Sequence, residues 1–195
     1  FKNLNNNNKF LITKRKKYSY VEFYNLILKY YDFAKQNINE KERICFISNN
    51  VIQYAIFANL IPMMGGIFVP LNPKSPKYEI ESKMKLISSK KIICDESISL
   101  GNINNVIQLI PYKKNNSTEK NKIKLNDYND TFSILFTSGS SGKPKPVSIS
   151  RKNIESSCKF SQENLRVSDK DIWLLCMPPY HAGGLSIIYR SILLS

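Results

Sequence analysis

A stretch of hydroxyl, glycine and lysine side chains between residues 136 and 146 has the residue types that bind phosphate groups. Glycine lets backbone N–H groups approach an anion closely, hydroxyls add further donors, and lysine supplies positive charge. The stretch follows an apolar run, so it is expected to begin where a buried strand ends. The candidate phosphate-binding residues are Thr137, Ser138, Gly139, Ser140, Ser141, Gly142, Lys143 and Lys145.

Two known phosphate-binding patterns do not fit this stretch. A Walker A loop needs G-x-x-x-x-G-K-[ST], but Gly139 and Gly142 are only three residues apart and Lys143 is followed by proline. The glycine pattern of protein kinases does not fit either. A flexible Ser-Gly linker is the structural alternative, and it is disfavoured because linkers seldom follow an apolar strand and seldom carry a stiff Pro-Lys-Pro run.

The single histidine of the chain lies in a second segment, Met-Pro-Pro-Tyr-His-Ala-Gly-Gly-Leu-Ser-Ile-Ile-Tyr-Arg-Ser, which starts at Met177. His181 follows an aromatic residue and precedes a glycine pair. Taken alone, a histidine at the end of a strand is more often a hydrogen-bonded structural residue than a catalytic one. The residue types by themselves leave both roles open.

The stretch from Thr137 to Lys145 resembles the T-S-G-[ST]-[ST]-G-x-P-K signature of AMP-binding, adenylate-forming enzymes. This family includes acyl-CoA synthetases, firefly luciferase and the adenylation domains of peptide synthetases. Pro146 stands where the signature usually continues with glycine, and proline removes one N–H and fixes φ. The pair 49–50 (Asn-Asn), the run Gly-Gly-Ile-Phe-Val-Pro-Leu-Asn-Pro, Glu79 and the run Ile-Ile-Cys-Asp also recur in family members in this order. The resemblance implies that this loop holds the phosphates of ATP.

The histidine segment is similar to the P-x-x-H-x-x-G element of the same family. In relatives this element lies near the acyl pocket and the phosphate that is attacked, which implies a catalytic role for His181. The run H-x-x-G-L-S followed by arginine and serine is similar to 2-succinylbenzoate-CoA ligases of menaquinone and phylloquinone synthesis. Arg190 could pair with the extra carboxylate of such a substrate, or it could be a surface or packing residue. The candidate substrate-binding residues are Tyr180, Gly183, Gly184 and Arg190.

The resemblance implies a two-step reaction that uses ATP, Mg²⁺ and CoA. A carboxylate first attacks the α-phosphate of ATP, which releases pyrophosphate and forms an acyl-adenylate, and a thiol then displaces AMP. This chemistry depends on placement and charge stabilisation, so the loop needs hydrogen-bond donors rather than a nucleophile. Ser140 and Ser141 are therefore expected to be ligands. The expected partners are a small-molecule carboxylic acid, ATP and CoA.

Two other function classes compete with this interpretation. Residues 139–142 (Gly-Ser-Ser-Gly) faintly resemble the serine-rich signature of amidases, which are serine hydrolases, but the flanking Pro-Lys-Pro does not suit it and the G-x-S-x-G elbow is absent. A basic nucleic-acid-binding module is supported by net charge alone, which is +14 from 29 Lys and Arg against 15 Asp and Glu. The lysines form scattered clusters without a basic-aromatic stripe, which favours solvated surface and no nucleic-acid partner.

The elements around these segments alternate between helix and strand patterns. Ser19 and Glu22 form a capping box ahead of an amphipathic helix, and Ser75 and Pro76 suit the N-cap and N1 positions of a later helix. Such alternation predicts an α/β fold with a mainly parallel sheet, the N-terminal domain of an adenylate-forming enzyme. The expected elements in the first part are helices over 21–36, 51–64 and 77–89 and strands over 43–48, 66–71, 91–95 and 106–110.

A long polar stretch over residues 113–130 predicts a surface loop that separates two regions. The first region, about 1–112, is expected to be one subdomain, and 131–195 the phosphate-loop and histidine-element region. In the second region we expect strands over 131–137 and 172–177, a loop over 138–146, a helix around 153–165 and a helix after the glycine pair.

Cysteine use and hydropathy point to a cytoplasmic protein. Four cysteines lie far apart with no C-x-x-C pair, which predicts reduced thiols and no metal site. No charged residue occurs between Arg43 and Lys74, but asparagine, proline and glycine interrupt this run and argue against a membrane span. The opening residues do not have the pattern of a secretory signal peptide.

The chain starts with Phe1 and stops at Ser195 within an apparent apolar helix that has no capping signal. We therefore expect an incomplete N-terminal AMP-binding domain. The adenine-binding segment, the ribose-binding aspartate and the C-terminal domain with its catalytic lysine are expected beyond Ser195, so a further partner is the missing C-terminal half. A fragment of this kind would expose core surface, and we expect little or no ligase activity and a tendency to aggregate.

Overall fold

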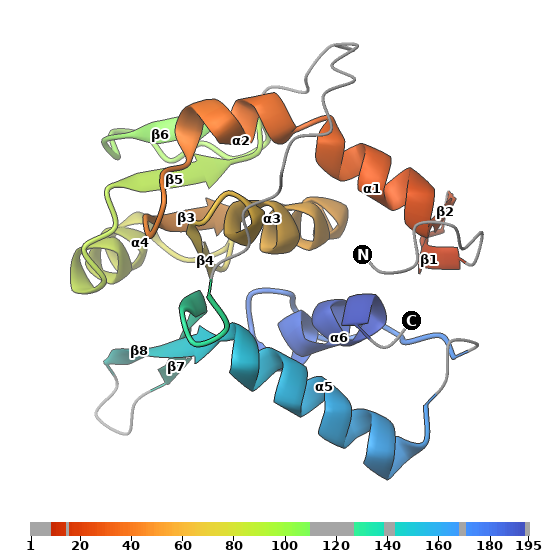
Figure 1. Cartoon of the computed structure of the whole chain (residues 1–195). Coiled ribbons are helices and arrows are strands. Elements are labelled where there is room, and N and C mark those ends of the chain that lie inside the picture. The colour runs from red at the N-terminus through yellow and green to blue at the C-terminus, as the bar shows by residue number, and fades with distance from the viewer. Residues whose placement is uncertain (1–8, 15, 110–126, 139–142, 168–170, 194–195) are drawn as a thin grey trace.

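The computed structural model describes residues 9–14, 16–109, 127–138, 143–167 and 171–193 (Figure 1). The strands are β1 (Lys9–Ile12), β2 (Lys17–Ser19), β3 (Arg43–Ile47), β4 (Ile67–Pro70), β5 (Lys91–Cys94), β6 (Val106–Gln108), β7 (Thr131–Ser138) and β8 (Pro144–Ser150). The helices are α1 (Tyr20–Leu28), α2 (Tyr31–Asn37), α3 (Val51–Met63), α4 (Lys77–Leu86), α5 (Arg151–Leu165) and α6 (Ala182–Leu193).

The central sheet has the strand order β6-β5-β3-β4-β7-β8. The strands from β6 to β7 run parallel, and β8 is an antiparallel edge strand. Helices connect the parallel strands, as in β3-α3-β4 and β4-α4-β5. The predicted α/β fold with a mainly parallel sheet is therefore confirmed. Because parallel strands end at one edge of a sheet, the segments that follow β3, β4, β5 and β7 lie at the same edge.

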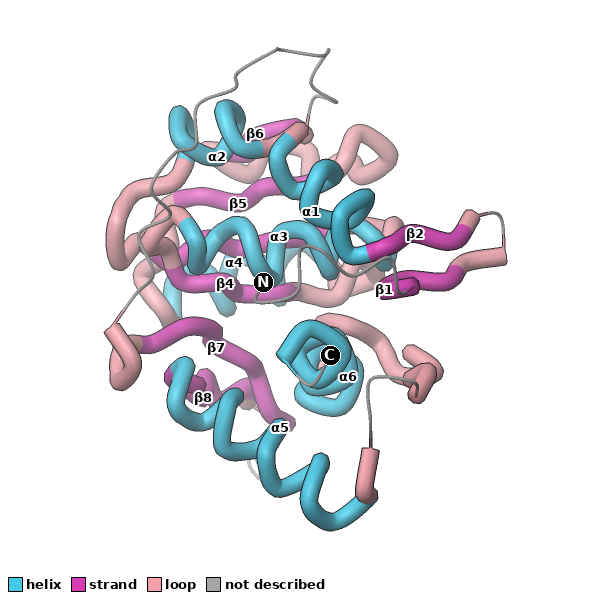
Figure 2. Tube along the Cα trace, turned by 45° about the vertical axis from the view of Figure 1, so that its right-hand side comes forward, coloured by secondary structure: helices cyan, strands magenta, loops and turns pink. Residues whose placement is uncertain are grey.

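Helices cover both faces of the sheet, and the alternation of side chains along β3 shows how. Ile44 and Phe46 point into a core shared with α3, whereas Cys45 and Ile47 point into a core shared with α4. Helices α1 and α2 pack on the outside of α3, and Figure 2 shows these three helices on one face and α4 behind the sheet. A strand buried on both faces is apolar throughout, which explains its Ile-Cys-Phe-Ile run.

Polar contacts join β7 and α6 to the first half of the chain. Ser133 Oγ in β7 donates a hydrogen bond to the Phe68 carbonyl of β4 at 3.0 Å. Tyr189 Oη donates to the Ala58 carbonyl of α3 at 3.3 Å, and Tyr20 Oη donates to the Ser191 carbonyl at 2.8 Å. In Figure 1 the blue helix α6 accordingly lies against the α3 side of the molecule. None of the described helices is long and apolar enough to cross a bilayer.

The first helix differs from its prediction, because the structure divides it at Tyr30. The capping box is confirmed: Ser19 Oγ accepts from the Glu22 N–H and the Glu22 carboxylate accepts from the Ser19 N–H. Tyr30 has φ −103° and ψ 3°, which is not helical, and α2 starts after it. The break changes the direction of the chain and lets the Tyr30 and Phe33 rings both contact Phe57 of α3. Tertiary packing decides the helix boundary here.

Two further differences concern helix α4 and the start of the chain. Pro76, with φ −62° and ψ 152°, is the N-cap, so the prediction of Ser75 as N-cap and Pro76 as N1 is wrong by one residue. Asn72 explains the shift, because its side-chain oxygen and carbonyl accept from the N–H groups of Lys74 and Ser75 and form a turn. The hairpin of β1 and β2 is not predicted by the sequence pattern.

The second region shows the largest differences. Strand β8 occupies residues that were predicted to be loop and α5 begins at Arg151, so the described strands leave a connection of 139–143. The strand predicted over 172–177 is wrong: these residues form no strand, and Ile172 and Leu174 are 75% and 78% exposed. A strand needs a neighbour for its backbone hydrogen bonds, and none of the described strands lies beside this segment. Most of the predicted polar loop, residues 113–126, lies outside the described residues.

Candidate functional site

The predicted phosphate loop connects β7 to β8. Thr137 pairs with Lys145 across the two strands, and Thr137 Oγ1 donates to the Lys145 carbonyl at 3.5 Å. Ser138 is the last residue of β7, and Lys143 and Lys145 are exposed. Gly139, Ser140, Ser141 and Gly142 lie outside the described residues. Lys143 is therefore the last residue of the connection, and Lys145 and Thr137 lie on the two strands that flank it.

The two prolines of this segment fit the edge position of β8. Pro144 pairs with Ser138 and Pro146 pairs with Phe136. Proline cannot donate to a ladder, so within sheets it is found at edges, where its nitrogen faces away from the neighbouring strand. Because Pro144 and Pro146 are two residues apart, both nitrogens lie on the same side of β8. The proline at 146, which departs from the family signature, is thus compatible with the pairing.

Lys83 of helix α4 contacts Phe136 near the end of β7. The Lys83 ammonium lies 5.5 Å from the centre of the ring of Phe136, the residue that precedes Thr137 in the chain. Lys83 also forms an ion pair with Glu79. The hydrogen bond from Lys83 lowers the pKa of Glu79, although burial opposes this effect. Lys83 is only 9% exposed, so its charge is held in place by the carboxylate and the ring face.

The histidine element lies at the carboxyl-terminal edge of β3 and β4. The Tyr180 ring contacts the rings of both His181 and Tyr54, with centroid distances of 4.8 Å and 6.2 Å. The His181 N–H donates to the Pro178 carbonyl at 3.1 Å, and the His181 carbonyl accepts from Leu185 N–H at 2.9 Å. The imidazole itself is on an exposed residue. Tyr180 is therefore held between the protein interior and His181.

Tyr54 links the ends of the two strands on which this element rests. Its Oη donates to the Leu71 carbonyl, after β4, at 2.6 Å and accepts from the Ser48 N–H, after β3, at 3.3 Å. Burial raises the pKa of Tyr54 far above its ordinary value, while the hydrogen bond from Ser48 lowers it in part. The phenol therefore stays protonated and keeps donating to Leu71. The side chain is 1% exposed and acts as a clamp.

Asp95 fixes the loop after β3 from the end of β5. Its carboxylate accepts from the Asn49 N–H at 2.7 Å and lies 2.6 Å from Ser48 Oγ. The backbone N–H and the hydroxyl of Ser97 also donate to it. Burial raises the pKa of Asp95, but the hydrogen bonds from Ser48, Ser97 and Asn49 outweigh burial and leave it below its ordinary value. The carboxylate is fully used as a structural acceptor.

At the carboxyl-terminal edge of β3 and β4, the chain connections leave in opposite directions along the sheet. After β3 the chain crosses one face through α3 to reach β4, and after β4 it crosses the other face through α4 to reach β5 on the far side of β3. Loops on opposite faces leave a crevice outside the carboxyl ends of the two strands, and ligands bind there in open α/β sheets. Tyr180 lies at this edge through its contact with Tyr54, and β7, which leads into the predicted phosphate loop, is the next strand after β4.

The two glycines after His181 have packing constraints of different strength. A Cβ at Gly184 would lie 2.2 Å from the Pro178 carbonyl oxygen and 2.6 Å from that of Met177, both of which are backbone atoms. A Cβ at Gly183 would meet the flexible Met177 side chain, whose sulfur would be 2.4 Å away. Glycine at 184 thus lets the start of α6 approach the segment before His181.

Arg190 faces the interior between α6 and the segment 171–176. Its guanidinium lies 5.5 Å from the centre of the Trp173 ring. Its Nε is buried and has no hydrogen-bond partner among the described residues. Burial raises the pKa of the nearby Cys158 thiol to about 11, while the charge of Arg190 lowers it and that of Glu155 raises it. A buried N–H without an acceptor is costly, so this donor is suited to an acceptor supplied from outside the described residues.

A cavity of about 270 Å³ lies beside α6, between α5 and the last two strands. It opens next to Ala182 and Ser186, one and five residues after His181. Its lining is mainly apolar, with a few hydroxyl, amide and thiol groups. The lining residues are Leu135, Ile149, Asn153, Ile154, Ser157, Cys158, Ala182, Leu185, Ser186 and Tyr189.

The described residues contain no group of three or more His, Cys, Asp and Glu side chains placed to hold a metal ion. Of the predicted phosphate-binding residues, the described chain shows the Thr137 hydroxyl as one oxygen donor near the loop. Mg²⁺ prefers oxygen ligands and commonly keeps substrate phosphates among them.

A mainly parallel sheet with helices on both faces, and with the histidine element at its carboxyl edge, is an arrangement of the α/β class in which nucleotide-binding proteins occur. The family of AMP-binding enzymes matches residues 3–195, so the chain belongs to this family. A 2-succinylbenzoate--CoA ligase from Listeria innocua is 28% identical over 188 residues, which are 94% of this chain and 39% of that relative. The chain thus spans about two fifths of the relative's length.

Solved structures share the fold. O-succinylbenzoate Coenzyme A Synthetase (MenE) from Bacillus subtilis in complex with AMP has a TM-score of 0.80 at 21% identity, with 93% of this chain and 49% of that chain covered. The same enzyme in complex with ATP and magnesium ion has a TM-score of 0.76 at 19% identity, with 92% and 49% covered. The matched curated relatives are ligases, and this chain covers part of such an enzyme.

Sequence reasoning missed the residues that support the site. Tyr54, Ser48 and Lys83 anchor the strand ends and belong to no recognisable motif, whereas Asp95 ends the Ile-Ile-Cys-Asp run of the family resemblance but its role as an acceptor for the loop after β3 was not predicted. The nearby signals were the Asn-Asn pair after β3 and Glu79, which the family resemblance already includes. Their partners lie far apart in sequence, and only the fold brings them together.

Proposed function

We propose that this chain supplies the phosphate-binding and acyl-binding parts of an ATP-dependent acid–thiol ligase that acts on 2-succinylbenzoate. The observation that carries the proposal is the pairing of Thr137 on β7 with Lys145 on β8 at the sheet edge where the Tyr180 ring contacts Tyr54 and His181. Membership of the AMP-binding enzyme family and the similarity to 2-succinylbenzoate--CoA ligases support the same activity.

In the proposed first step the loop residues hold the β- and γ-phosphates of ATP. Lys143 and Lys145 offset the repulsion between the triphosphate and the incoming carboxylate, and the hydroxyls with the loop N–H groups act as donors. The substrate carboxylate oxygen forms a bond to the α-phosphorus, and the bond from that phosphorus to the bridging oxygen of pyrophosphate breaks. Pyrophosphate leaves with this electron pair. ATP-bound Mg²⁺ would neutralise part of the phosphate charge.

Tyr180 and His181 orient the acyl group in this proposal. The Tyr180 ring is fixed by Tyr54, and His181 is exposed beside it, so an imidazole N–H can donate to an oxygen of the reacting carboxylate or phosphate. The apolar cavity next to Ala182 and Ser186 accepts the aromatic part of the acid. In the second step the CoA thiol gives up its proton to solvent and its sulfur bonds to the acyl carbon. The bond from that carbon to the phosphate oxygen breaks, and AMP leaves with the electron pair.

Arg190 is the proposed partner of the second carboxylate of 2-succinylbenzoate. Its buried Nε lacks an acceptor among the described residues, and its guanidinium is positioned over Trp173. A carboxylate can accept two parallel hydrogen bonds from a guanidinium, which a lysine would not provide. An acid without this second carboxylate would leave Arg190 unsatisfied and is expected to react less well.

ATP–pyrophosphate exchange by the native gene product that contains this chain tests the proposal. We expect exchange that depends on 2-succinylbenzoate, falls at least tenfold with benzoate, and falls by roughly a hundredfold in Lys145→Ala. Arg190→Lys is expected to lose the preference for 2-succinylbenzoate over benzoate while keeping exchange with benzoate. Exchange that is the same with both acids, or is unchanged in Lys145→Ala, would contradict the proposal.

A further inference from the structure

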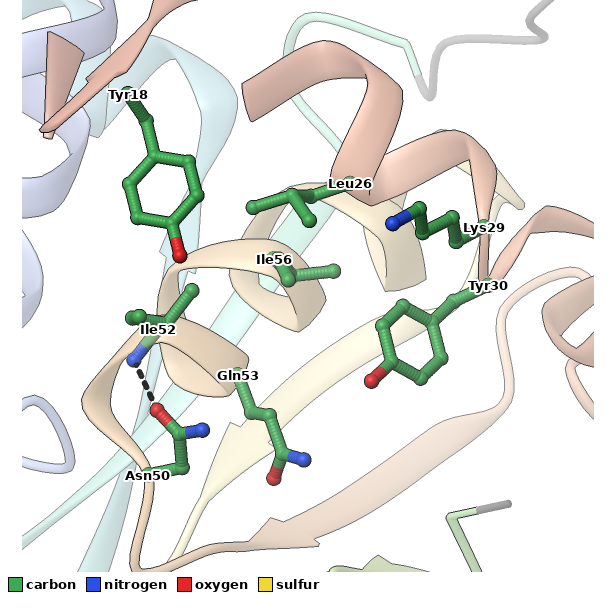
Figure 3. Close-up of a pocket in the computed structure, with 8 residues that line it drawn as sticks. All are labelled: Tyr18, Leu26, Lys29, Tyr30, Asn50, Ile52, Gln53 and Ile56. Atoms are coloured by element: carbon green, nitrogen blue, oxygen red, sulfur yellow. Dashed lines mark hydrogen bonds between the residues drawn. The ribbon is translucent and has the colours of Figure 1, made fainter. Parts of the chain in front are cut away.

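A second cavity, of about 310 Å³, lies between α1, β2 and the start of α3 (Figure 3). It is formed by strand β2, the end of α1, the break before α2 and the first turns of α3. Its lining residues are Tyr18, Leu26, Lys29, Tyr30, Asn50, Ile52, Gln53 and Ile56. None of them belongs to the phosphate loop or the histidine element.

The floor and sides of this cavity are apolar. Figure 3 shows Leu26 and Ile56 between the rings of Tyr18 and Tyr30, which stand on opposite sides. Ile52 extends this surface along α3. A space of this size is at the lower end of the range for small-molecule pockets, so it suits a compact body such as one ring.

The polar groups at the rim are donors. The Lys29 side chain is exposed, its ammonium points back toward Leu26 in Figure 3, and it forms no ion pair with another described residue. Burial raises the pKa of Tyr30, contact with Gln53 lowers it in part, and the charge of Glu96 raises it further. The Tyr30 phenol is therefore a protonated donor at neutral pH.

Lys29 is the one charged residue among the eight that line the cavity, and part of the acceptor capacity at the rim is already used. The Asn50 side-chain oxygen accepts from the Ile52 N–H at 2.9 Å, and Gln53 Oε1 lies 2.6 Å from Ser48 Oγ. None of the eight lining residues is acidic. A carboxylate would find an ammonium and a phenol here.

We propose that this cavity is a binding site for a small monocarboxylate with an aromatic body, separate from the site of the proposed ligase reaction. The carboxylate pairs with Lys29 and accepts from Tyr30, and the ring packs on Leu26 and Ile56. This assignment does not depend on the proposed function.

The position on α3 connects such a site to the histidine element. Ile52 and Gln53 line the cavity. The next residue in α3, Tyr54, does not line it and instead contacts the Tyr180 ring. A ligand that contacts Ile52 and Gln53 therefore binds next to Tyr54, the residue that contacts Tyr180.

Titration of this chain with benzoate, followed by ¹H–¹⁵N NMR and calorimetry, tests the proposal. We expect saturable shifts of the Ile52, Gln53 and Tyr30 amide signals and roughly tenfold weaker binding to Lys29→Gln, because one charge-assisted hydrogen bond is lost. The matched control Lys35→Gln, an exposed lysine on α2, should bind benzoate like the unchanged chain. Benzamide, which has the same ring without the charge, should bind at least tenfold more weakly.

Reversing the charge at residue 29 adds a test in which binding of a different ligand is gained, so the result does not rest on loss of binding alone. Lys29→Glu should lose benzoate and gain binding of benzylammonium with the same three amide signals shifted. Equal benzoate affinity of Lys29→Gln and the unchanged chain would overturn the proposal. Shifts restricted to Ser186 and Tyr189 would also overturn it, because they would place benzoate in the cavity beside α6. Failure here leaves the ligase proposal standing, because that proposal is measured by pyrophosphate exchange.

Discussion

The rings of Tyr54 and Tyr180 lie 6.2 Å apart at an angle of 54°, and this contact joins the histidine element to the interior of the sheet. Tyr54 belongs to the first helix of the β-α-β unit, whereas Tyr180 directly precedes His181. The Tyr54 hydroxyl bridges the backbone after β3 and after β4. The position of Tyr180 is thus determined by the same hydroxyl that fixes the two strand ends.

Removing this hydroxyl should destabilise the fold. In Tyr54→Phe the Leu71 carbonyl and the Ser48 N–H lose their partner in a buried place, and we expect a loss of about 1–3 kcal/mol in the free energy of unfolding. Urea denaturation followed by circular dichroism measures it. Tyr78→Phe, which removes a hydroxyl from a side chain that is 73% exposed, is the control and should change little. Equal stability of the two variants would contradict the role of Tyr54.

The two glycines after His181 should respond differently to alanine. Gly184→Ala places a Cβ against two backbone carbonyls and should cost about 1–3 kcal/mol, because backbone must move. Gly183→Ala meets only the Met177 side chain, which is half exposed and can turn away, and should cost less. Thermal unfolding of the pair measures the order. A larger loss for Gly183→Ala would show that the approach of α6 to Pro178 is wrong.

Acid should weaken the fold partly through Asp95. The pKa of this carboxyl is lower in the folded chain than its ordinary value of 3.8. A carboxyl of this kind stabilises the fold above its unfolded pKa, and the contribution is lost as the pH falls through the lower folded pKa. Urea midpoints between pH 6 and pH 2.5 should therefore fall less steeply below about pH 4 in Asp95→Asn. Glu81→Gln, in an exposed pair with Lys77, should keep the steep fall.

The serine hydrolase alternative predicts a nucleophilic serine in the loop, and the ligase proposal does not. We expect a fluorophosphonate probe to leave Ser140 and Ser141 unmodified, as detected by mass spectrometry of the intact chain and its peptides. A nucleophilic serine requires a base within hydrogen-bonding reach. Stoichiometric labelling of either serine would favour hydrolysis.

Much of the fold is predictable from the sequence because local patterns and tertiary packing agree there. The Ile-Cys-Phe-Ile run of β3 is apolar on both faces, and the Ser19–Glu22 capping box is a local interaction, so each is visible in the sequence. The break at Tyr30 is not visible, because it is caused by Phe57, which is distant in sequence. The segment 172–177 has the apolar composition of a strand, but a strand also needs a neighbour.

The motif residues of the candidate site are predictable from the sequence, but the residues that hold the strand ends in place are not. Thr137, Lys143, Lys145 and His181 belong to short motifs that carry their chemistry in the sequence. The clamp by Tyr54 is formed by groups 17 and 6 residues away. The contact of Lys83 with Phe136 likewise depends on the fold. Their roles follow from geometry alone.

Calorimetric titration of this chain with ATP and with inorganic triphosphate tests the central claim most directly, because it isolates phosphate binding from turnover. We expect both to bind, Lys145→Ala to weaken both by roughly tenfold through loss of a charged contact, and Lys152→Ala, an exposed lysine on α5, to bind like the unchanged chain. Equal affinity of Lys145→Ala and the unchanged chain for both ligands would contradict the assignment of residues 137–145 as the phosphate loop.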